Sequence, residues 1–331
     1  MAYLVWLELA ICILIIFFFG HRVAIYGDII AEKTRLGGLW IGLVLISITT
    51  SLPELFNGVS SIFIVNAPDL TVGNLLGANT FNLFNLALLD MASRSGSIML
   101  AVGKGQKLAG WYGIILVALI AIPLLFQSLA DIRLGWLGLT TPIIMIIYLF
   151  SIRQIFLSDK KNPAVTNEQS KYETHSLKRT FILFTISALF IIGAGIWLAT
   201  IGEDISRITG LGESFIGSIL ISFTTTLPEI TVSFSALRLG AVDMAMSNML
   251  GSNMFNMFLI CFDDIIYTKG PILSAVSSNN LITAVTIIVL TLITLAGLYF
   301  KPRRLFRLSW YNILIFGIFI TGAYLNFAAN R

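Results

Sequence analysis

A short motif ending in Pro-Glu occurs twice in this chain, both times inside a long apolar segment. It reads TTSLPE at residues 49–54 and TTTLPE at residues 224–229. A proline within a helix has no N–H for the carbonyl four residues earlier, so each copy leaves one carbonyl without its helical partner. In lipid such a group needs a polar neighbour, and a carboxylate there marks a functional site by default. Glu54 and Glu229 therefore constrain the fold more than any other feature.

The composition places these two motifs in a lipid bilayer. Only 11% of the 331 residues are charged and 57% are hydrophobic, whereas soluble domains carry about 25% charged residues. The net charge of +4 comes from basic residues between apolar runs, which argues against a nucleic-acid partner. Cys12 and Cys261 lie within apolar runs. A free cysteine there behaves as a small hydrophobe, so we expect no disulfide.

Runs of about 20 apolar residues predict membrane spans, and the chain has ten of them. The first has no basic residue before it and no cleavage pattern, so we expect a retained span rather than a signal peptide. The second and seventh contain the motif prolines and are long enough to be broken or steeply tilted helices. The ten spans are residues 3–21, 37–65, 70–92, 108–127, 133–152, 178–200, 212–238, 241–262, 279–299 and 306–327.

The loops between these spans differ strongly in charge. Of the 21 Lys and Arg residues, 17 fall in loops on one side and 4 on the other. Because basic residues concentrate in cytoplasmic loops, we expect both termini outside and the central loop in the cytoplasm, in the cell membrane.

One hydrophilic stretch, residues 158–178, divides the spans five and five. Because five is odd, the second half must enter the membrane from the opposite side, as in the inverted repeats of secondary transporters. The predicted fold is an all-α integral membrane protein whose ten transmembrane helices form two inverted five-helix repeats. The expected division is residues 1–152 for the first repeat, 153–177 for a cytoplasmic linker and 178–331 for the second repeat.

Each proline motif carries hydroxyl groups on the same helix face as its glutamate. The spacing i, i+3, i+4 and i+7 places four oxygen-bearing side chains on one side of a helix. Hydroxyls on a helix face also commonly bond backbone or a neighbouring helix, so the stripe alone does not define a site. The residues are Ser47, Thr50, Ser51 and Glu54 in the first half, and Ser222, Thr225, Thr226 and Glu229 in the second.

The span after each motif provides a second polar wall. Residues 73–82 read GNLLGANTFN and align with residues 247–256, which read SNMLGSNMFN. The small residues four apart let helix backbones approach closely. The aligned asparagines lie three apart, on one face, and either line a cavity or join helices. They are Asn79 and Asn82 in the first half and Asn253 and Asn256 in the second.

Together these residues offer carboxylate, amide, hydroxyl and carbonyl oxygens without thiolate or imidazole, which suits a hard cation. Calcium takes six to eight such ligands, and sodium can use a subset of them. One Ca2+ or two Na+ would neutralise Glu54 and Glu229. An empty cavity would leave two buried charges unpaired, which is costly. The charge balance therefore favours obligatory exchange over leak.

The pairing of S/T-x-x-T-[ST]-L-P-E with G-[AS]-N-x-F-N, once in each half, resembles the alpha repeats of the sodium/calcium exchangers in the cation/calcium exchanger superfamily, in a compact prokaryotic-type form. The resemblance implies a secondary-active antiporter that exchanges Ca2+ for Na+ by alternating access, with movement of the first and sixth spans. It implies no enzyme activity, no cofactor and no obligatory protein partner. The implied metal ligands are Glu54, Glu229, Thr50, Ser51, Thr225, Thr226, Ser47 and Ser222 through backbone oxygen, Asn82, Ser252 and Asn256.

Two positions depart from the family pattern. Ala78 stands where the family often has Ser, and Asn256 stands where microbial relatives often have Asp. The cavity then holds two carboxylates at its four key positions, which is closer to the animal exchangers and disfavours potassium co-transport. The large calcium-sensing domains of those exchangers are absent from this sequence.

Two other functions fit the same residues. A proton-coupled cation antiporter would load and unload hydrogen ions at Glu54 and Glu229, which could titrate as a coupled pair. The hydroxyl-rich walls favour sodium, because proton carriage needs no such ligands. A passive cation channel fits less well with inverted repeats around one midplane site. An intramembrane enzyme is disfavoured because the sequence has neither H-E-x-x-H nor G-x-S-x-G.

The orientation can be tested with a cysteine placed in the central loop. We predict that Asn167→Cys reacts only with reagents admitted to the cytoplasm, because this loop carries six basic residues. Labelling with an impermeant thiol reagent, in intact and in permeabilised cells, measures its side. Reaction from outside intact cells would overturn the predicted orientation.

Overall fold

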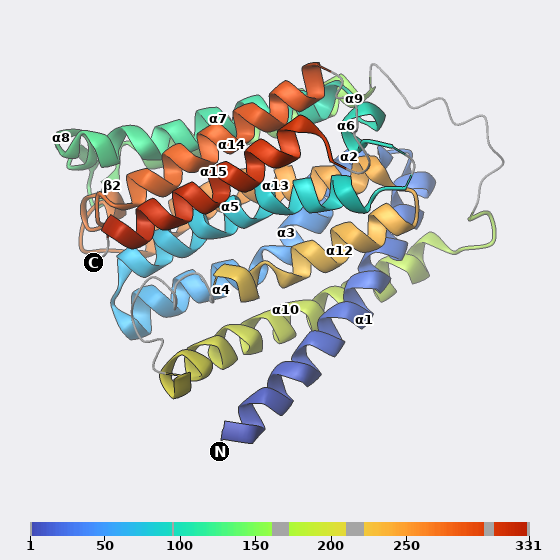
Figure 1. Cartoon of the computed structure of the whole chain (residues 1–331), viewed down its shortest axis with the longest axis horizontal. Coiled ribbons are helices and arrows are strands. Elements are labelled where there is room, and N and C mark those ends of the chain that lie inside the picture. The colour runs from blue at the N-terminus through green and yellow to red at the C-terminus, as the bar shows by residue number, and fades with distance from the viewer. Residues whose placement is uncertain (1, 95, 161–171, 210–221, 301–307, 330–331) are drawn as a thin grey trace.

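The structure is a computed structural model and describes residues 2–94, 96–160, 172–209, 222–300 and 308–329. It is a bundle of long helices with one short β-hairpin (Figure 1). The first half consists of α1 (Ala2–Thr34), α2 (Gly37–Trp40), η1 (Ile41–Ile46), α3 (Ser47–Thr50), α4 (Leu52–Ser60), η2 (Ser61–Val65), α5 (Pro68–Ala92), α6 (Ile98–Ala101), α7 (Lys104–Leu125), α8 (Gln127–Ala130), β1 (Arg133–Leu134), β2 (Leu137–Gly138) and α9 (Thr140–Lys160).

The second half has fewer described elements, and residues 210–221 and 301–307 lie outside the description. It consists of α10 (Leu177–Thr209), α12 (Leu227–Arg238), α13 (Val242–Ile266), η3 (Ile272–Ser274), α14 (Asn280–Tyr299) and α15 (Trp310–Ala329).

Within the described residues, eight helices are long and apolar enough to cross a membrane. The third predicted span corresponds to α5, a 25-residue helix. It is long enough to cross a membrane but is less apolar than the other eight, because it carries the asparagines of the polar wall. The seventh predicted span, residues 212–238, lies partly outside the description. Its described part is a helical turn at residues 222–225 followed by α12.

Three predicted spans differ from the structure by seven residues or more at one end or both. The first was expected to end at residue 21, but α1 continues to Thr34. Its extension is amphipathic, with Val23, Ala24 and Ile30 buried in a cluster with residues of α10 and α12, and this packing keeps the segment helical. The fifth was expected from residue 133, but residues 133–138 form the hairpin, whose turn contains Gly135 at a φ of +69°, and the helix begins at Thr140. The sixth was expected to end at residue 200, but α10 continues to Thr209.

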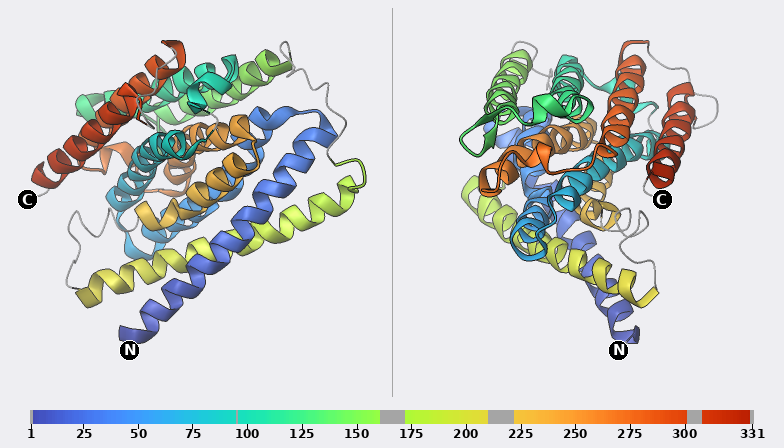
Figure 2. Two further views of the ribbon diagram at one scale, coloured as in Figure 1. Left: turned by 45° about the vertical axis from the view of Figure 1, so that its right-hand side comes forward. Right: turned by 90° about the vertical axis from the view of Figure 1, so that its left-hand side faces the viewer.

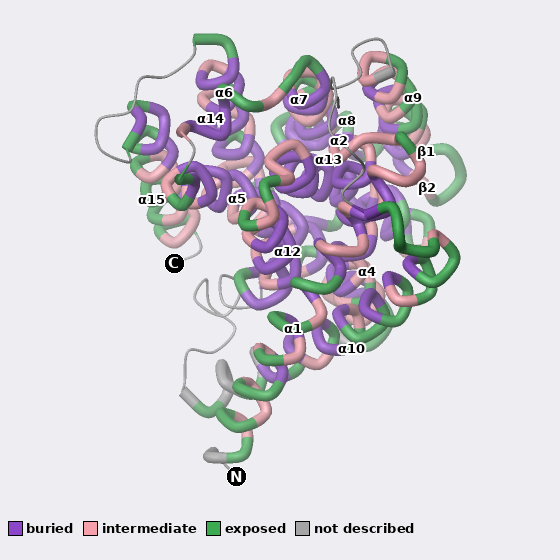
Figure 3. The backbone as a smooth tube through the Cα atoms, turned by 90° about the vertical axis from the view of Figure 1, so that its right-hand side faces the viewer, coloured by how far each residue is buried: buried purple, intermediate pink, exposed green. Residues whose placement is uncertain are grey.

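The polar-wall helices lie in the middle of the bundle. Most residues of α13 and α5 are buried (Figure 3). In contrast, α1 and α10 pack against each other along one side of the molecule (Figures 1 and 2). Cys12 and Cys261 are both free and buried, so the absence of a disulfide predicted from the sequence is confirmed.

Both proline motifs break their helices at equivalent residues. The helix stops at Ser51, where α3 gives way to α4, and again at Thr226, just before α12. Pro53 and Pro228 are the second residues of the new helices, where the missing N–H costs least. The prediction that the second span is broken is therefore confirmed, and the described part of the seventh shows the same interruption.

Glycines in the polar walls allow the two repeats to approach closely. A methyl group at Gly251 of α13 would collide with the carbonyl oxygen of Leu43 in η1. A methyl group at Gly77 of α5 would collide with the hydroxyl of Ser222. Where the halves meet, Gly251 therefore packs against the backbone of Leu43, and Gly77 packs against the side chain of Ser222.

We predict that Gly251→Ala destabilises the protein by about 1–3 kcal/mol, because overpacking a dense helix contact forces backbone shifts. Gly113→Ala in α7 is the matched control, since a methyl group there has no neighbour within 4 Å. The control should be neutral or stabilising by about 0.5–1 kcal/mol. Thermal unfolding in detergent measures both, and equal melting temperatures would contradict the assigned contact.

Candidate ion-binding site

The two motif glutamates begin the helices that follow the breaks. Glu54 lies in the first turn of α4 and Glu229 in the first turn of α12, and each is only 1% exposed. Negative charge is favoured at a helix N-terminus, where unsatisfied N–H groups gather. The local sequence thus stabilises each carboxylate within the membrane without a basic side chain.

Glu229 is bonded to hydroxyls from both repeats. Its Oε1 accepts a hydrogen bond from the Ser51 hydroxyl at 3.0 Å and a longer one from Ser252 at 3.5 Å. Its Oε2 is buried and has no hydrogen-bond partner among the described residues. One carboxylate therefore joins the break of the first repeat to helix α13 of the second.

Glu54 has even fewer partners. Neither of its buried carboxylate oxygens accepts a hydrogen bond from a described residue. The hydroxyl of Thr225 and the carboxylate of Glu229, both from the other repeat, lie within electrostatic range. The two carboxylates thus face one site at the junction of the repeats, and three of their four oxygens have no hydrogen-bond partner among the described residues.

The hydroxyl stripes serve partly as backbone partners. Thr50 Oγ1 donates to the Ser47 carbonyl at 3.3 Å, and Thr225 Oγ1 donates to the Ser222 carbonyl at 3.2 Å. Thr226 Oγ1 donates to the Phe223 carbonyl at 3.0 Å. Thr226 therefore departs from its repeat equivalent, Ser51, which reaches across to Glu229.

The asparagines divide into two pairs with different surroundings. Asn79 Nδ2 donates to the Asn253 carbonyl at 3.0 Å, and Asn253 Nδ2 donates to the Asn79 carbonyl at 3.3 Å. This pair joins α5 to α13. Asn256 donates to Asn79 Oδ1 at 2.9 Å but keeps a free Oδ1, and both amide atoms of Asn82 are buried without a described partner. Free amide oxygens are thus offered by Asn82, by Asn256 and also by Asn253, whose buried Oδ1 has no partner among the described residues.

Two further asparagines hold the breaks in place. Asn248 Nδ2 donates to the Glu229 carbonyl at 3.3 Å, and its Oδ1 accepts from Thr50 at 3.4 Å. Asn74 Oδ1 accepts from Ser222 at 3.2 Å. Sequence reasoning did not select these two residues for the site. The sequence does contain a signal for them, because an asparagine occupies the second position of both aligned segments, GNLLGANTFN and SNMLGSNMFN.

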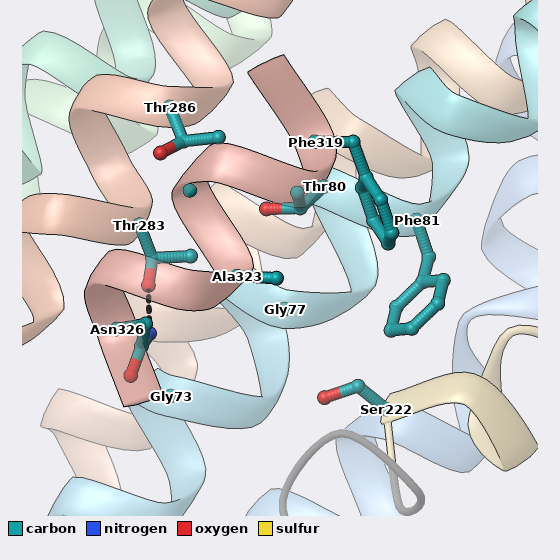
Figure 4. A pocket seen from close by; sticks show the side chains of 11 residues that line it. Gly73, Gly77, Thr80, Phe81, Ser222, Thr283, Thr286, Phe319, Ala323 and Asn326 are labelled. Carbon is teal, nitrogen blue, oxygen red and sulfur yellow. Dashed lines mark hydrogen bonds between the residues drawn. The ribbon is translucent and has the colours of Figure 1, made fainter. Parts of the chain in front are cut away.

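A small pocket lies beside this site, between α5, α14 and α15. Its walls are mainly glycine, threonine and phenylalanine, with Asn326 bonded to Thr283 across it (Figure 4). It touches the site only through Ser222 and Gly77. No described residue that lines the pocket carries a carboxylate, so the pocket is distinct from the place where the free oxygens lie.

The chemistry of the site follows from its buried oxygen atoms. Its free groups are carboxylate and amide oxygens, and the described residues contain no cluster of three His, Cys, Asp or Glu side chains. Two carboxylates buried without a basic partner are costly, and a bound cation would remove that cost. Oxygen donors alone select hard cations over transition metals.

The sequence pattern of the family described as "Sodium/calcium exchanger protein" matches residues 4–153 and again residues 179–328. The chain belongs to the sodium/calcium exchanger family. It is therefore a multi-pass membrane transporter of a cation antiporter family and not an enzyme. The family and the two-repeat helical fold predicted from the sequence are confirmed.

Relatives are found in archaea and bacteria. Sodium/calcium exchanger MaX1 of Methanosarcina acetivorans is 27% identical over 266 residues, covering 70% of this chain and 74% of the relative. Inner membrane protein YrbG of Escherichia coli is 22% identical over 267 residues, with 80% of each chain covered. The solved structure of the sodium-calcium exchanger NCX_Mj, soaked with 10 mM Na+, superposes with a TM-score of 0.73 at 18% identity, covering 97% of this chain and 98% of that one.

We predict that substitutions at Asn82 and Asn79 have opposite effects on protein stability. Asn82→Leu should weaken cation binding while leaving stability unchanged or higher, because it replaces an unpartnered buried amide. Asn79→Leu should cost about 1–3 kcal/mol, because it leaves the Asn253 carbonyl and the Asn256 amide without partners. Melting temperatures and calcium titration of the purified proteins measure both. A destabilised Asn82→Leu variant with normal calcium binding would contradict this division.

Proposed function

We propose that this antiporter exchanges Ca2+ for Na+ by alternating access at the junction of its repeats. The observation that supports this most is the set of buried oxygens without partners, which comes from both repeats and includes both motif glutamates. Buried polar atoms are normally bonded, so a concentration of free oxygens marks a place that a ligand completes.

The proposed ligand set combines these oxygens with the hydroxyls and carbonyls around the breaks. Calcium requires six to eight oxygens, and the site offers enough without imidazole or thiolate. The proposed ligands are Glu54, Glu229, Thr50, Ser51, Thr225, Thr226, the backbone oxygens of Ser47 and Ser222, Asn82, Ser252 and Asn256.

The charge of the site suggests why exchange is obligatory. One Ca2+ or two Na+ neutralise Glu54 and Glu229, whereas the empty site holds two uncompensated charges in a low-dielectric interior. Leaving such charges unpaired costs several kcal/mol. The loaded forms therefore cross between the two access states more readily than the empty form does.

Sodium is the proposed driving ion, and the proton is the second candidate. Hydroxyl groups next to both carboxylates suit sodium coordination, and a proton would need only the carboxylates. The relatives named sodium/calcium exchangers support the sodium assignment. Proton coupling remains the alternative because Glu54 and Glu229 interact electrostatically and could exchange protons as a pair.

We further propose that the protein lies in the cell membrane with both termini outside and the central loop in the cytoplasm. The ends of α1 and α9 and the start of α10 lie together, opposite both chain ends (Figure 1). At that end Tyr172 donates to Asp28 Oδ2 at 2.8 Å, and Lys33 donates to the Glu173 carbonyl at 2.9 Å. Residues 172–173, in the described part of the linker, are thereby bonded to the last two turns of α1.

Calcium uptake into proteoliposomes, under an imposed sodium, proton or potassium gradient, tests the coupling ion. We expect an outward sodium gradient to drive calcium uptake, and proton or potassium gradients of equal size to drive none. Uptake driven by the proton gradient alone would replace sodium with the proton as the coupling ion. Equal, unsaturable uptake under every gradient would indicate a channel.

We predict that Glu54→Gln and Glu229→Gln each reduce exchange by at least ~100-fold while the protein still folds and inserts. Removing one charge from a buried ionic site costs about 3 kcal/mol or more, which corresponds to that factor in ion affinity. Glu173→Gln is the control, since this carboxylate is exposed in the linker. Calcium flux per inserted protein measures the effect. Normal flux in either site variant would remove that glutamate from the ligand set.

A further inference from the structure

Asp263 of α13 is a third carboxylate buried within the bundle. Its side chain is 0% exposed, and neither of its oxygens has a hydrogen-bond partner among the described residues. The next residue, Asp264, is fully bonded. It accepts from the backbone N–H of Gly138 at 2.9 Å, from that of Ile272 at 2.7 Å, and from the Thr141 hydroxyl.

The repeat shows that Asp264 has the structural role and Asp263 does not. In the first half Asp90 accepts from the backbone N–H of Ile98 at 2.8 Å, as Asp264 does from Ile272. In both halves the bonded amide lies eight residues after the aspartate, so each carboxylate fixes the turn that follows its helix. The residue before Asp90 is Leu89, an apolar side chain. Asp263 is therefore an addition that this helix end does not require.

The Asp263 carboxylate faces Gly58 of α4. A Cβ atom at Gly58 would lie 2.8 Å from Asp263 Oδ1 and 3.0 Å from Oδ2. Gly58 is one helical turn beyond Glu54 and on the same face, and Asp263 is two turns beyond Asn256 on the same face of α13. Asp263 thus lies about 10 Å along α13 from Asn256, between the ion site and the end of the bundle that carries the hairpin.

The surroundings of Asp263 suit a proton rather than a metal ion. Sodium or calcium needs several oxygens, whereas the Gly58 carbonyl already accepts the Thr71 hydroxyl at 3.4 Å, and no described carboxylate or imidazole cluster surrounds the site. A proton needs one carboxylate oxygen. Its binding converts a costly unpaired anion into a neutral group.

Other titratable groups lie on the helix of Asp263, on the helix that carries Gly58, and on α5, β1 and the segment after α13. Cys261 and Asp264 are on its own helix, and Glu54 lies one turn from Gly58 on α4. Asp69, at the start of α5, bonds the backbone N–H of Ser277 and the Asn280 amide, and Lys269, after α13, donates to Asn66 Oδ1. Arg133 of β1 is exposed. None of them forms a hydrogen bond with Asp263.

We propose that Asp263 is a proton-binding site, separate from the two-glutamate site, on the path between that site and the hairpin end. The protonated form leaves the path neutral, and the ionised form attracts cations toward Glu54. Protons at the hairpin end therefore compete with cation access. The effect on transport rests on the proposed exchange function, whereas proton binding itself does not.

Infrared spectroscopy of the full chain in lipid, as a function of pH, tests proton binding directly. The background is Glu54→Gln with Glu229→Gln, which removes the signals of the ion site. We expect a carboxylic-acid carbonyl band that disappears as the pH rises. It should be lost in Asp263→Asn and in Asp263→Leu, which copies the first repeat, and retained in Asp131→Asn, whose carboxylate is exposed.

Identical spectra with and without Asp263, across the whole pH range, would overturn the proposal. The Leu variant keeps the test decisive if Asp263→Asn does not fold. Gly58→Ala gives a positional check, because its methyl group would press on Asp263 Oδ1 and should shift the band. Gly113→Ala, which meets no neighbouring atom, should leave the band unchanged.

Calcium flux at varied pH on the hairpin side tests the effect on transport. We expect the apparent cation affinity of the wild type to decrease as the pH is lowered. The decrease should be up to ~10-fold per pH unit for one competing proton. Asp263→Asn should have a low affinity that depends less on pH. If the apparent cation affinities of the wild type and of Asp263→Asn depend on pH in the same way, Asp263 does not lie on the ion path. Absence of sodium-driven exchange would contradict the proposed function alone, because the infrared result is independent of it.

Discussion

The structure depends on the burial of Glu54 and Glu229 without a basic partner for either. Burial of an unpaired carboxylate in a low-dielectric interior costs several kcal/mol, and this molecule buries two within electrostatic range of each other. Two features reduce that cost: each glutamate begins a helix, and Ser51 and Ser252 bond Glu229. A bound cation would remove the remaining cost, and this is the physical basis of the proposed ion site.

The backbone around the glutamates is interrupted for the same purpose. Helix breaks are tolerated in a membrane only where the freed groups are buried in protein or line a polar cavity. Here Asn248 bonds Thr50 and the Glu229 carbonyl next to the breaks, while Gly77 and Gly251 let neighbouring segments come close enough to enclose them. The proline motif and the asparagine–glycine motif are therefore two parts of one arrangement.

The repeats are similar in sequence but not identical in use. Ser51 crosses to Glu229, whereas its equivalent Thr226 bonds its own helix. Glu229 is half bonded, whereas Glu54 has two free oxygens. Asp263 replaces the Leu89 of the other half. Such differences give a pseudo-symmetric scaffold an asymmetric set of polar groups.

The sequence by itself determined the membrane class, the two repeats, the breaks and the residues of both polar walls, because apolar length, proline chemistry and duplication are local properties. Only the tertiary structure decided which asparagines join helices and which stay free. Asn79 and Asn82 occur in the same motif, yet only Asn79 bonds α13. It also decided that α1 extends to Thr34 and that Asp263 faces Gly58. These outcomes depend on contacts between residues far apart in the chain, and the local spacing of residues in the sequence does not predict such contacts.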